Sequence, residues 1–256
     1  MRSSPIAPQR IVSLVPSQTE LLFDLSLEDK VVGVTKFCCH PAEKVKNIAK
    51  IGGTKNFDFE KIKVLNPDLI IGNKEENYKE GIETLQRDFP VWISDIVTLE
   101  DSLSMIQQVG ELTHKAPEAF TICQQLSTQF DSLQSPSHRP RVAYFIWKKP
   151  YMVAANGTFI HEMLGKAGFL NVFGDLARYP EISESDLQQA APELIFLSSE
   201  PYSFREKHLL EFQEICPAAH IKLVDGELFS WYGSRLLKSV AYFNELRDSL
   251  SKFFVS

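Results

Sequence analysis

Cysteine and histidine side chains that could bind a metal are concentrated in one short segment, Cys38-Cys39-His40. Thiolate and imidazole groups are the ligands that zinc and other borderline metals prefer in proteins. A closed zinc site needs four ligands, usually in spaced pairs, and the chain contains no C-x-x-C or H-x-x-x-H sequence. Three interpretations therefore stay open: a metal site, a contact to a bound ligand, and a buried thiol beside a hydrogen-bonded imidazole.

The spacing in this segment favours Cys38 and His40 as the pair that shares a ligand. On an extended backbone, residues separated by one position lie on the same side, so Cys39 would point away. Two protein ligands are too few for a tight metal site. A metal would also need His161, Tyr232, a carboxylate or the ligand itself. We therefore expect weak or no binding of free zinc, and a Cys38 thiol that alkylates readily when no ligand is bound.

Strand-like runs precede the segments that could hold a ligand. Val31–Val34 leads into the Cys38-Cys39-His40 loop, and Ile11–Val15 leads into Pro16-Ser17-Gln18-Thr19-Glu20. Ser17 can cap the following helix, with Glu20 at the capping-box position. In open α/β sheets, ligands bind at the carboxyl ends of strands, where helix N-termini present backbone N–H groups.

A long helical stretch over residues 98–135 lies in the middle of the chain. Apolar residues recur there at spacings of three and four, which predicts a first helix from about Leu99 to Leu112. A second helix is expected to begin near Pro117 and to end at Gln134-Ser135-Pro136. Its roughly eighteen residues would span about 27 Å, long enough to connect two small lobes.

Similar sequence segments occur on both sides of this stretch, and the two members of each pair lie about 130 residues apart. The pairs are Arg10-Ile11-Val12 with Arg141-Val142-Ala143, Asn66–Ile71 with Ala191–Phe196, and Val91–Asp95 with Ile221–Asp225. Any α/β chain can repeat helix–proline–strand phrases, but three pairs in the same order favour two structurally similar halves. Because helical and strand-like segments alternate, the sheets should be mainly parallel.

Composition limits the classes of protein that this chain can belong to. The chain has 256 residues, and its formal net charge of -6 argues against non-specific binding of nucleic acid. No run of eighteen apolar residues exists that could span a membrane. The start, MRSSPIAPQR, lacks the apolar region of a signal peptide, so either the chain is cytosolic or an export signal has been removed from it. The four cysteines do not form the pattern of a disulfide framework, which favours a reducing compartment.

The chain resembles the class III substrate-binding proteins of ABC importers, which include cobalamin and siderophore receptors and helical-backbone metal receptors. The resemblance rests on the order and spacing of Arg10–Leu22, Val31–Val34, Glu60–Ile71, Glu200–Phe204 and Val224–Arg235. It implies an α/β fold of two Rossmann-like lobes with mainly parallel sheets, joined by a long interdomain helix, with a ligand cleft between the lobes. The corresponding domains would be 1–114, the linking helix 115–136, and 137–256.

The cobalamin-binding branch is the most similar, through the loop Ser199–Phe204 and the segment Trp147–Tyr151. Receptors of this branch stack aromatic side chains on a flat macrocycle. Transferred position by position, the resemblance implies ligand contacts from Ser17, Gln18, Phe37, Cys38, His40, Trp147, Tyr151, Phe173, Tyr179, Trp231, Tyr232 and Arg235. Family receptors also carry one exposed glutamate per lobe that pairs with permease arginines. The candidates are Glu76 or Glu80, and Glu200 or Glu206.

Two functional hypotheses follow. In the first, a monomeric binding protein without catalytic residues or a required cofactor captures a corrinoid or an iron-siderophore for an ABC permease. The resemblance would place it in the periplasm or at the cell surface. In the second, a cytoplasmic metal-handling protein or chelatase-like enzyme uses Cys38, His40 and His161 on a bare metal ion. The missing signal peptide favours the second hypothesis, whereas the aromatic loops favour the first, which we adopt.

Overall fold

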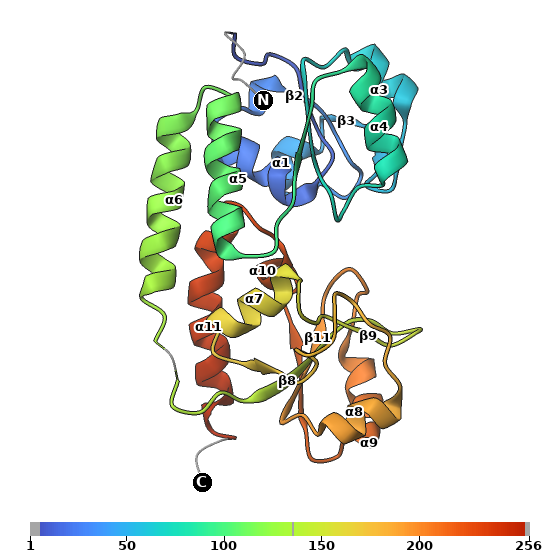
Figure 1. Ribbon diagram of the computed structural model, residues 1–256, viewed down its shortest axis with the longest axis vertical. Helices are drawn as coiled ribbons and strands as arrows, with labels where there is room; N and C mark the ends of the chain where they lie inside the picture. Colours follow the sequence, from blue (N-terminus) through green and yellow to red (C-terminus); the bar gives the residue numbers. More distant parts are fainter. Residues whose placement is uncertain (1–5, 135, 254–256) are drawn as a thin grey trace. The chain divides into compact units, whose positions relative to one another are not determined.

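The structure, a computed structural model, describes residues 6–134 and 136–253, which form two compact units (Figure 1). Unit 1 comprises Met1–Ile96, Glu100–Leu126 and Tyr232–Arg235, and unit 2 comprises Val97–Leu99, Ser127–Trp231 and Leu236–Ser256. Residues 1–5, which belong to the N-terminal segment considered above, and Ser135, in the predicted helix stop, lie outside the described residues. The domain boundaries expected from the sequence stay a prediction.

Unit 1 is built on a parallel sheet with the strand order β3-β2-β1-β6-β7. Its strands are β1 (Ile11–Ser13), β2 (Val31–Val34), β3 (Ala49–Lys50), β6 (Leu69–Asn73) and β7 (Val91–Ser94), and β4 (Gly52–Gly53) pairs separately with β5 (Asn56–Phe57). The helices are α1 (Pro16–Asp24), η1 (Glu28–Lys30), α2 (Ala42–Val45), α3 (Phe59–Leu65), α4 (Lys79–Asp88), α5 (Leu99–Leu112) from Glu100 onward, and α6 (Ala116–Asp131) as far as Leu126. Helices α3 and α4 cover one face of the sheet, while α1 and α5 lie on the other (Figure 1). Both faces are therefore covered, which explains why β1 and β6 are buried along their whole length.

Unit 2 contains a second parallel sheet with the order β10-β8-β11-β12. Its strands are β8 (Arg141–Trp147), β10 (Leu170–Asn171), β11 (Leu194–Ser198) and β12 (His220–Val224), and β9 (Met152–Val153) pairs with β8 in antiparallel fashion. The helices are α7 (Phe159–Lys166), α8 (Glu184–Ala190), η2 (Glu206–His208), α9 (Leu209–Ile215), α10 (Glu227–Ser230) and α11 (Leu236–Ser251). Aromatic rings fill part of its core, where Phe145 and Phe212 pack edge-to-face with centroids 4.7 Å apart.

The internal similarity expected from the sequence is confirmed by the topology of the sheets. Strands β2-β1-β6-β7 of unit 1 and β10-β8-β11-β12 of unit 2 follow the same connectivity. The paired phrases form β1 with β8, β6 with β11, and β7 with β12. All of these neighbours are parallel, so the predicted fold class is also confirmed.

The same hydrogen bonds fix the first strand of each unit. In unit 1 the Asp68 carboxylate accepts from the Arg10 backbone N–H at 2.9 Å, and Arg10 Nε donates to the carbonyl of Leu65 at 2.8 Å. In unit 2 the Glu193 carboxylate accepts from the Arg141 N–H at 2.8 Å, and the Arg141 guanidinium donates to the carbonyl of Ala190. The residues that end the preceding helices, Asn66 and Ala191, both have φ of 43°. The repeated sequence segments therefore form the same set of hydrogen bonds, which we call the latch, between the end of a helix and the start of a strand.

The predicted helix starts are confirmed in the central stretch but not at Ser17. Helix α6 begins at Ala116 and has Pro117 in its first turn, as expected. Helix α1 begins at Pro16, with Val15 as its N-cap residue and no side-chain cap. The capping box predicted for Ser17 and Glu20 is therefore wrong, because proline takes the first helical position and moves Ser17 inside the helix.

The segment Tyr232–Arg235, which we call the return segment, belongs to unit 1 although unit 2 precedes and follows it in the chain. Arg235 Nε and Nη2 donate to the two carboxylate oxygens of Glu20 in α1, at 2.6 and 2.8 Å, and both side chains are buried. The N–H of Gly233 donates to Ser102 Oγ at 3.1 Å. Gly233 has φ of +100°, a conformation that other residues rarely adopt, so glycine is suited to this bend.

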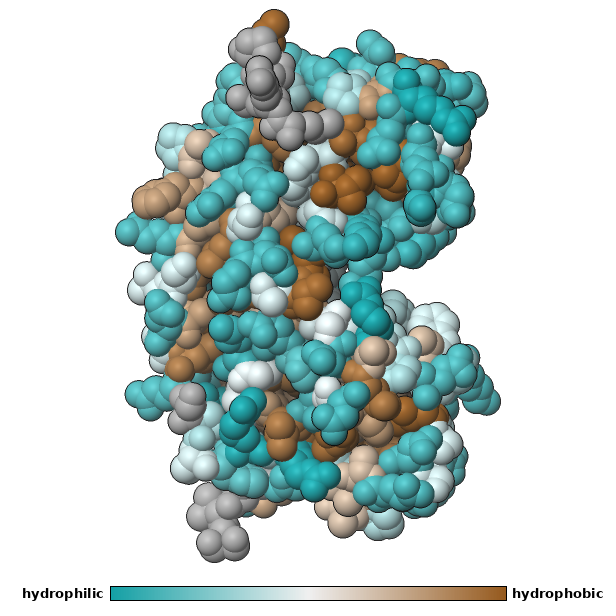
Figure 2. Space-filling model, in the orientation of Figure 1, coloured by the Kyte–Doolittle hydropathy of each residue, from teal (hydrophilic) through white to brown (hydrophobic). Residues whose placement is uncertain are grey.

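The surface is that of a typical globular protein. On the face shown in Figure 2, hydrophilic residues cover most of each unit and hydrophobic residues form small separate patches. Among residues 6–134 and 136–253, no helix has the length and apolar character needed to cross a membrane.

We predict that the ion pair between Glu20 and Arg235 stabilises the folded chain strongly. Removing one partner leaves the other charge buried without its counterpart, which typically costs about 3–5 kcal/mol. Arg235→Met and Glu20→Leu should each lower the free energy of unfolding by that amount. The double variant should recover most of the loss, since an apolar pair removes both desolvation penalties.

Urea unfolding followed by circular dichroism measures these free energies. Lys61→Met, which removes an exposed cation of unit 1 paired with Asp58, is the control and should change the unfolding free energy by about 0.5 kcal/mol or less. Single variants as stable as the wild type would contradict a stabilising role for the buried pair.

Candidate functional site

Buried polar side chains form a layer at the carboxyl edge of the sheet in unit 1. Gln18 Nε2 donates to Ser94 Oγ at 2.6 Å, and Asn73 Nδ2 donates to the same oxygen at 3.1 Å. Asn77 Oδ1 accepts from the backbone N–H of Asn73 at 2.8 Å. These residues follow or end β1, β6 and β7, whose carboxyl ends meet at one edge because the strands are parallel. The layer fixes the loops that leave this edge.

Two of the expected ligand contacts belong to this layer. Ser17 and Gln18 lie in the first turn of α1, and both are buried. The Gln18 amide oxygen has no hydrogen-bond partner among the residues that the structure describes. A buried amide oxygen with spare acceptor capacity is compatible with a bound water molecule or ligand.

The structure contradicts the expected orientation of Cys38. Its thiol is buried, with Sγ 3.1 Å from Thr19 Oγ1 and 3.2 Å from Thr35 Oγ1. The Cys38 N–H donates to the carbonyl of Thr35, so the chain turns here and is not extended. The prediction that Cys38 and His40 share a side was wrong for this reason. Burial also raises the pKa of the Cys38 thiol, which makes it a poor nucleophile.

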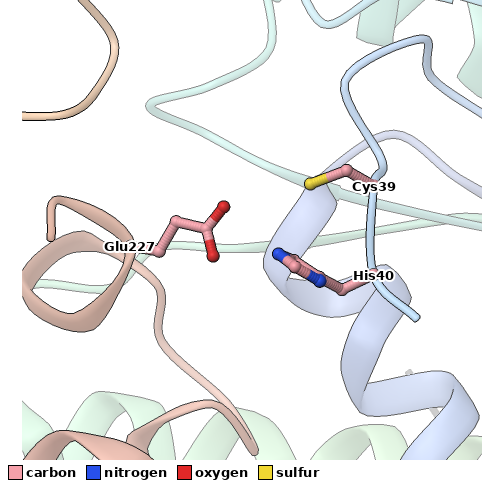
Figure 3. A group of neighbouring side chains, drawn as sticks. All are labelled: Cys39, His40 and Glu227. Carbon is pink, nitrogen blue, oxygen red and sulfur yellow. The ribbon is translucent and has the colours of Figure 1, made fainter. Parts of the chain in front are cut away.

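Cys39 and His40 are instead the pair that extends together from this loop (Figure 3). Cys39 Sγ and a ring nitrogen of His40 lie within 4.8 Å of each other. Glu227, also drawn there, begins α10 in unit 2. Two ligands from one loop of unit 1 do not complete a zinc site. The proposed pair of Cys38 and His40 has no geometric support, because the Cys38 sulfur points into the core.

The return segment brings two further candidates into unit 1. The Tyr232 hydroxyl donates to Glu76 Oε1 at 3.1 Å, and burial together with the Glu76 charge raises the pKa of Tyr232. Tyr232 is therefore protonated at neutral pH. Arg235 uses its guanidinium to hold Glu20 and is 7% exposed. In this structure Arg235 positions the return segment.

In unit 2, Trp147 lines a surface pocket with a volume of about 470 Å³. Trp147 ends β8; the residue is 39% exposed, and its ring packs edge-to-face on Tyr202, with centroids 5.6 Å apart. The other lining residues are Lys148, Lys149, Lys207 and His208. None of these four residues, nor Tyr202, is among the ligand contacts expected from the sequence. The consecutive lysines after Trp147 were a signal for Lys148 and Lys149 alone, because Lys207 and His208 belong to η2, which is distant in sequence.

The other aromatic candidates of unit 2 do not line this pocket. Tyr151 donates its hydroxyl to Glu211, and burial raises its pKa. Phe173 belongs to the hydrophobic core, and Trp231 is buried with Nε1 donating to Glu200 at 2.9 Å. Tyr179 is half-buried beneath the Arg178 guanidinium, and Phe37 of unit 1 is exposed beneath the Lys36 ammonium.

The four glutamates that could bind a permease differ in their surroundings. Glu76 accepts from Tyr232, and Glu200 accepts from Trp231 and, at 2.6 Å, from Ser230 Oγ. Burial raises the pKa of Glu200. Glu80, in the first turn of α4, and Glu206, at the start of η2, are both exposed.

Comparison with known proteins identifies the family. The periplasmic binding protein family matches residues 11–215, and the chain belongs to this family. A vitamin B12-binding protein of Vibrio campbellii (strain ATCC BAA-1116) is 28% identical over 195 residues, covering 74% of this chain and 70% of the relative. The predicted family is thereby confirmed, and the metal-handling or chelatase-like alternative is not favoured.

Solved structures show the same fold. The periplasmic vitamin B12 binding protein BtuF of Vibrio cholerae aligns with a TM-score of 0.78 and 24% identity, covering 97% of this chain and all (100%) of that chain. The periplasmic heme-binding protein RhuT from Roseiflexus sp. RS-1 aligns with a TM-score of 0.83 and 22% identity, covering 94% of this chain and 98% of that one.

We predict that Cys39, and not Cys38, is the thiol that alkylates in the native protein. Cys39 is exposed, whereas the remaining three cysteines are buried, and burial raises the pKa of Cys123 to about 11. Iodoacetamide at pH 8 should therefore label one position, located by tandem mass spectrometry of the peptide. Cys39→Ser should abolish this labelling and Cys38→Ser should leave it unchanged. Rapid native labelling of Cys38 would show that its burial is incorrect.

Proposed function

We propose that this protein is a substrate-binding protein that captures a metal chelate, a corrinoid or a ferric siderophore, for import by an ABC transporter. One observation carries the proposal: the match to the periplasmic binding protein family runs through residues 11–215, which include the whole parallel sheet of unit 1 and strands β8, β10 and β11 of unit 2. The relative from Vibrio campbellii and the BtuF structure are both named for binding vitamin B12, which makes corrinoids the first ligands to test.

The chemistry of the described site supports binding and offers no evident catalytic group. Its thiol at Cys38 is buried with a raised pKa, and its arginine, Arg235, is engaged by Glu20. An exposed indole at Trp147 suits stacking on a flat macrocycle. We propose that the protein is not an enzyme and needs no cofactor, the chelate being cargo.

The ligand contacts that we propose come from the loops at the carboxyl ends of the strands. Phe37 and His40 follow β2 in unit 1. In unit 2, Trp147 is the last residue of β8 and Tyr202 follows β11. Cys38 and Arg235 are reassigned from ligand contacts to residues that position these loops. The interlobe cleft and the domain limits of the sequence analysis stay predictions.

For the permease contact, we propose Glu80 in unit 1 and Glu206 in unit 2. Both carboxylates are exposed, while Glu76 and Glu200 accept hydrogen bonds from tyrosine, serine and tryptophan side chains of this chain. The matched family is named for periplasmic binding proteins, which supports a periplasmic location. We propose a monomer that works there or at the cell surface and delivers its ligand to an ABC permease.

We predict that corrinoids quench the tryptophan fluorescence of the protein and that Trp147 contributes to their affinity. Aromatic stacking contributes on the order of 1 kcal/mol, so Trp147→Ala should weaken binding roughly fivefold or more. The protein is titrated with cyanocobalamin, dicyanocobinamide, a ferric hydroxamate and a ferric catecholate. Tryptophan fluorescence measures the quenching, and isothermal titration calorimetry measures the affinities.

Phe120→Ala provides the matched control, because Phe120 is also an exposed aromatic residue but lies on α6, away from the strand ends. Its affinity for the ligand should equal that of the wild type. If none of these chelates binds, the proposed function is wrong. If a chelate binds equally well to Trp147→Ala, stacking by this residue is wrong.

A further inference from the structure

The pocket beside Trp147 carries a concentration of positive charge in a protein whose formal net charge is -6. We call it the lysine pocket, and it is lined by Trp147, Lys148, Lys149, Tyr202, Lys207 and His208. None of these lining residues is acidic. A volume of about 470 Å³ lies within the range of small-molecule sites.

Two of the lysines have no acidic partner among the residues that the structure describes. Lys148 forms an ion pair with Glu211, which also accepts from the Tyr151 hydroxyl. Lys149 and Lys207 are exposed, and neither forms an ion pair with any residue in 6–134 or 136–253. Their ammonium groups can therefore approach a bound anion without first giving up an internal partner. Such charge-assisted hydrogen bonds are stronger than those between neutral groups.

Tyr202 offers a further hydrogen-bond donor. The backbone N–H of Arg205 donates to His208 Nδ1 at 2.9 Å, so the neutral imidazole carries its proton on Nε2. Burial, followed by the charges of Lys148 and Lys207, lowers the pKa of His208 and keeps the ring neutral. His208 Nε2 lies 3.3 Å from the Tyr202 hydroxyl and can donate to its oxygen. The hydroxyl hydrogen of Tyr202 is then available to an acceptor in the pocket.

One side of the pocket is aromatic. Trp147 and Tyr202 pack at an interplanar angle of 69°, and Trp147 Nε1 donates to the carbonyl of Lys149 at 3.1 Å. This hydrogen bond fixes the indole relative to Lys149, and Trp147 as a whole residue remains 39% exposed. A flat ring can stack there with its charged substituents directed to the lysines.

We propose that the lysine pocket binds the carboxylate-bearing edge of a flat chelate, so that the protein selects ligands with anionic side groups over ligands with neutral ones. The inference rests on the proposed function, because it specifies the charge of the chelate that this protein captures. The lysines pair with the carboxylates, Tyr202 donates a hydrogen bond, and Trp147 stacks on the ring.

Two corrinoids with the same ring provide the test. Dicyanocobyrinic acid carries carboxylates around the corrin, whereas dicyanocobinamide carries amides. Two charge-assisted contacts should give the wild type a preference for the acid on the order of tenfold, measured by calorimetry. Lys149→Gln combined with Lys207→Gln should lose this preference.

A matched variant separates local from overall charge. Lys166→Gln combined with Lys252→Gln also removes two cations from unit 2, but neither residue lines the pocket. This variant should keep the wild-type preference, and circular dichroism should show that both double variants are folded. If both corrinoids bind equally well to the wild type, the inference is overturned while the proposed function stands.

A planar anion that is not a chelate tests the lysine pocket in the remaining case, in which neither corrinoid binds. If neither corrinoid binds, the proposed capture of corrinoids fails, and 1,3,6,8-pyrenetetrasulfonate then tests the pocket alone. The anion site is supported if this probe quenches the tryptophan fluorescence of the wild type and of the Lys166 and Lys252 double variant. The quenching should be lost in the Lys149 and Lys207 double variant. If 1,3,6,8-pyrenetetrasulfonate does not bind to the wild type, the proposed anion site is overturned.

Discussion

The buried ion pair between Glu20 and Arg235 is the constraint on which the organisation of unit 1 depends. Desolvating a carboxylate and a guanidinium is costly, and only close bidentate geometry offsets that cost. The two residues are separated by most of the chain, so the pair forms only after the return segment has joined α1. Gly233 and Tyr232 then bond to Ser102 and Glu76, which fixes the loops at the carboxyl edge of this sheet.

The two units achieve the same local order with different side chains. Asp68 and Glu193 each accept a hydrogen bond from the backbone N–H of an arginine at the amino end of a strand, Arg10 before β1 and Arg141 in β8. Each arginine side chain donates to the last residue of the helix that precedes this carboxylate in the chain. This latch sets the amino ends of the strands. The opposite ends are left to loops of varied composition: a thiol and imidazole in unit 1, and lysines with aromatic rings in unit 2. The scaffold is thus repeated, while the side chains at the carboxyl ends of the strands differ.

Much of the fold could be predicted because its signals are local. The proline after Asn66 and after Ala191, the apolar strand runs and the periodicity of α5 depend only on neighbouring residues. The site was harder to predict, because the orientation of its side chains depends on contacts with residues that are distant in the sequence. Cys38 was expected to face a ligand, but Thr19 and Thr35 hold its sulfur in the core. Arg235 was expected to bind ligand, but nothing near it in sequence reveals its contact with Glu20. Lys207 and His208 reach the pocket of Trp147 only through the packing of η2.

We propose that the loops around Trp147 and Tyr202 receive a metal chelate. Anomalous diffraction at the cobalt edge, from crystals grown with saturating dicyanocobinamide, would locate such a ligand. One cobalt peak is expected, at the centre of a corrin ring that contacts Trp147. The absence of a peak, or a bare cobalt ion held by Cys39 and His40 without a corrin, would contradict it.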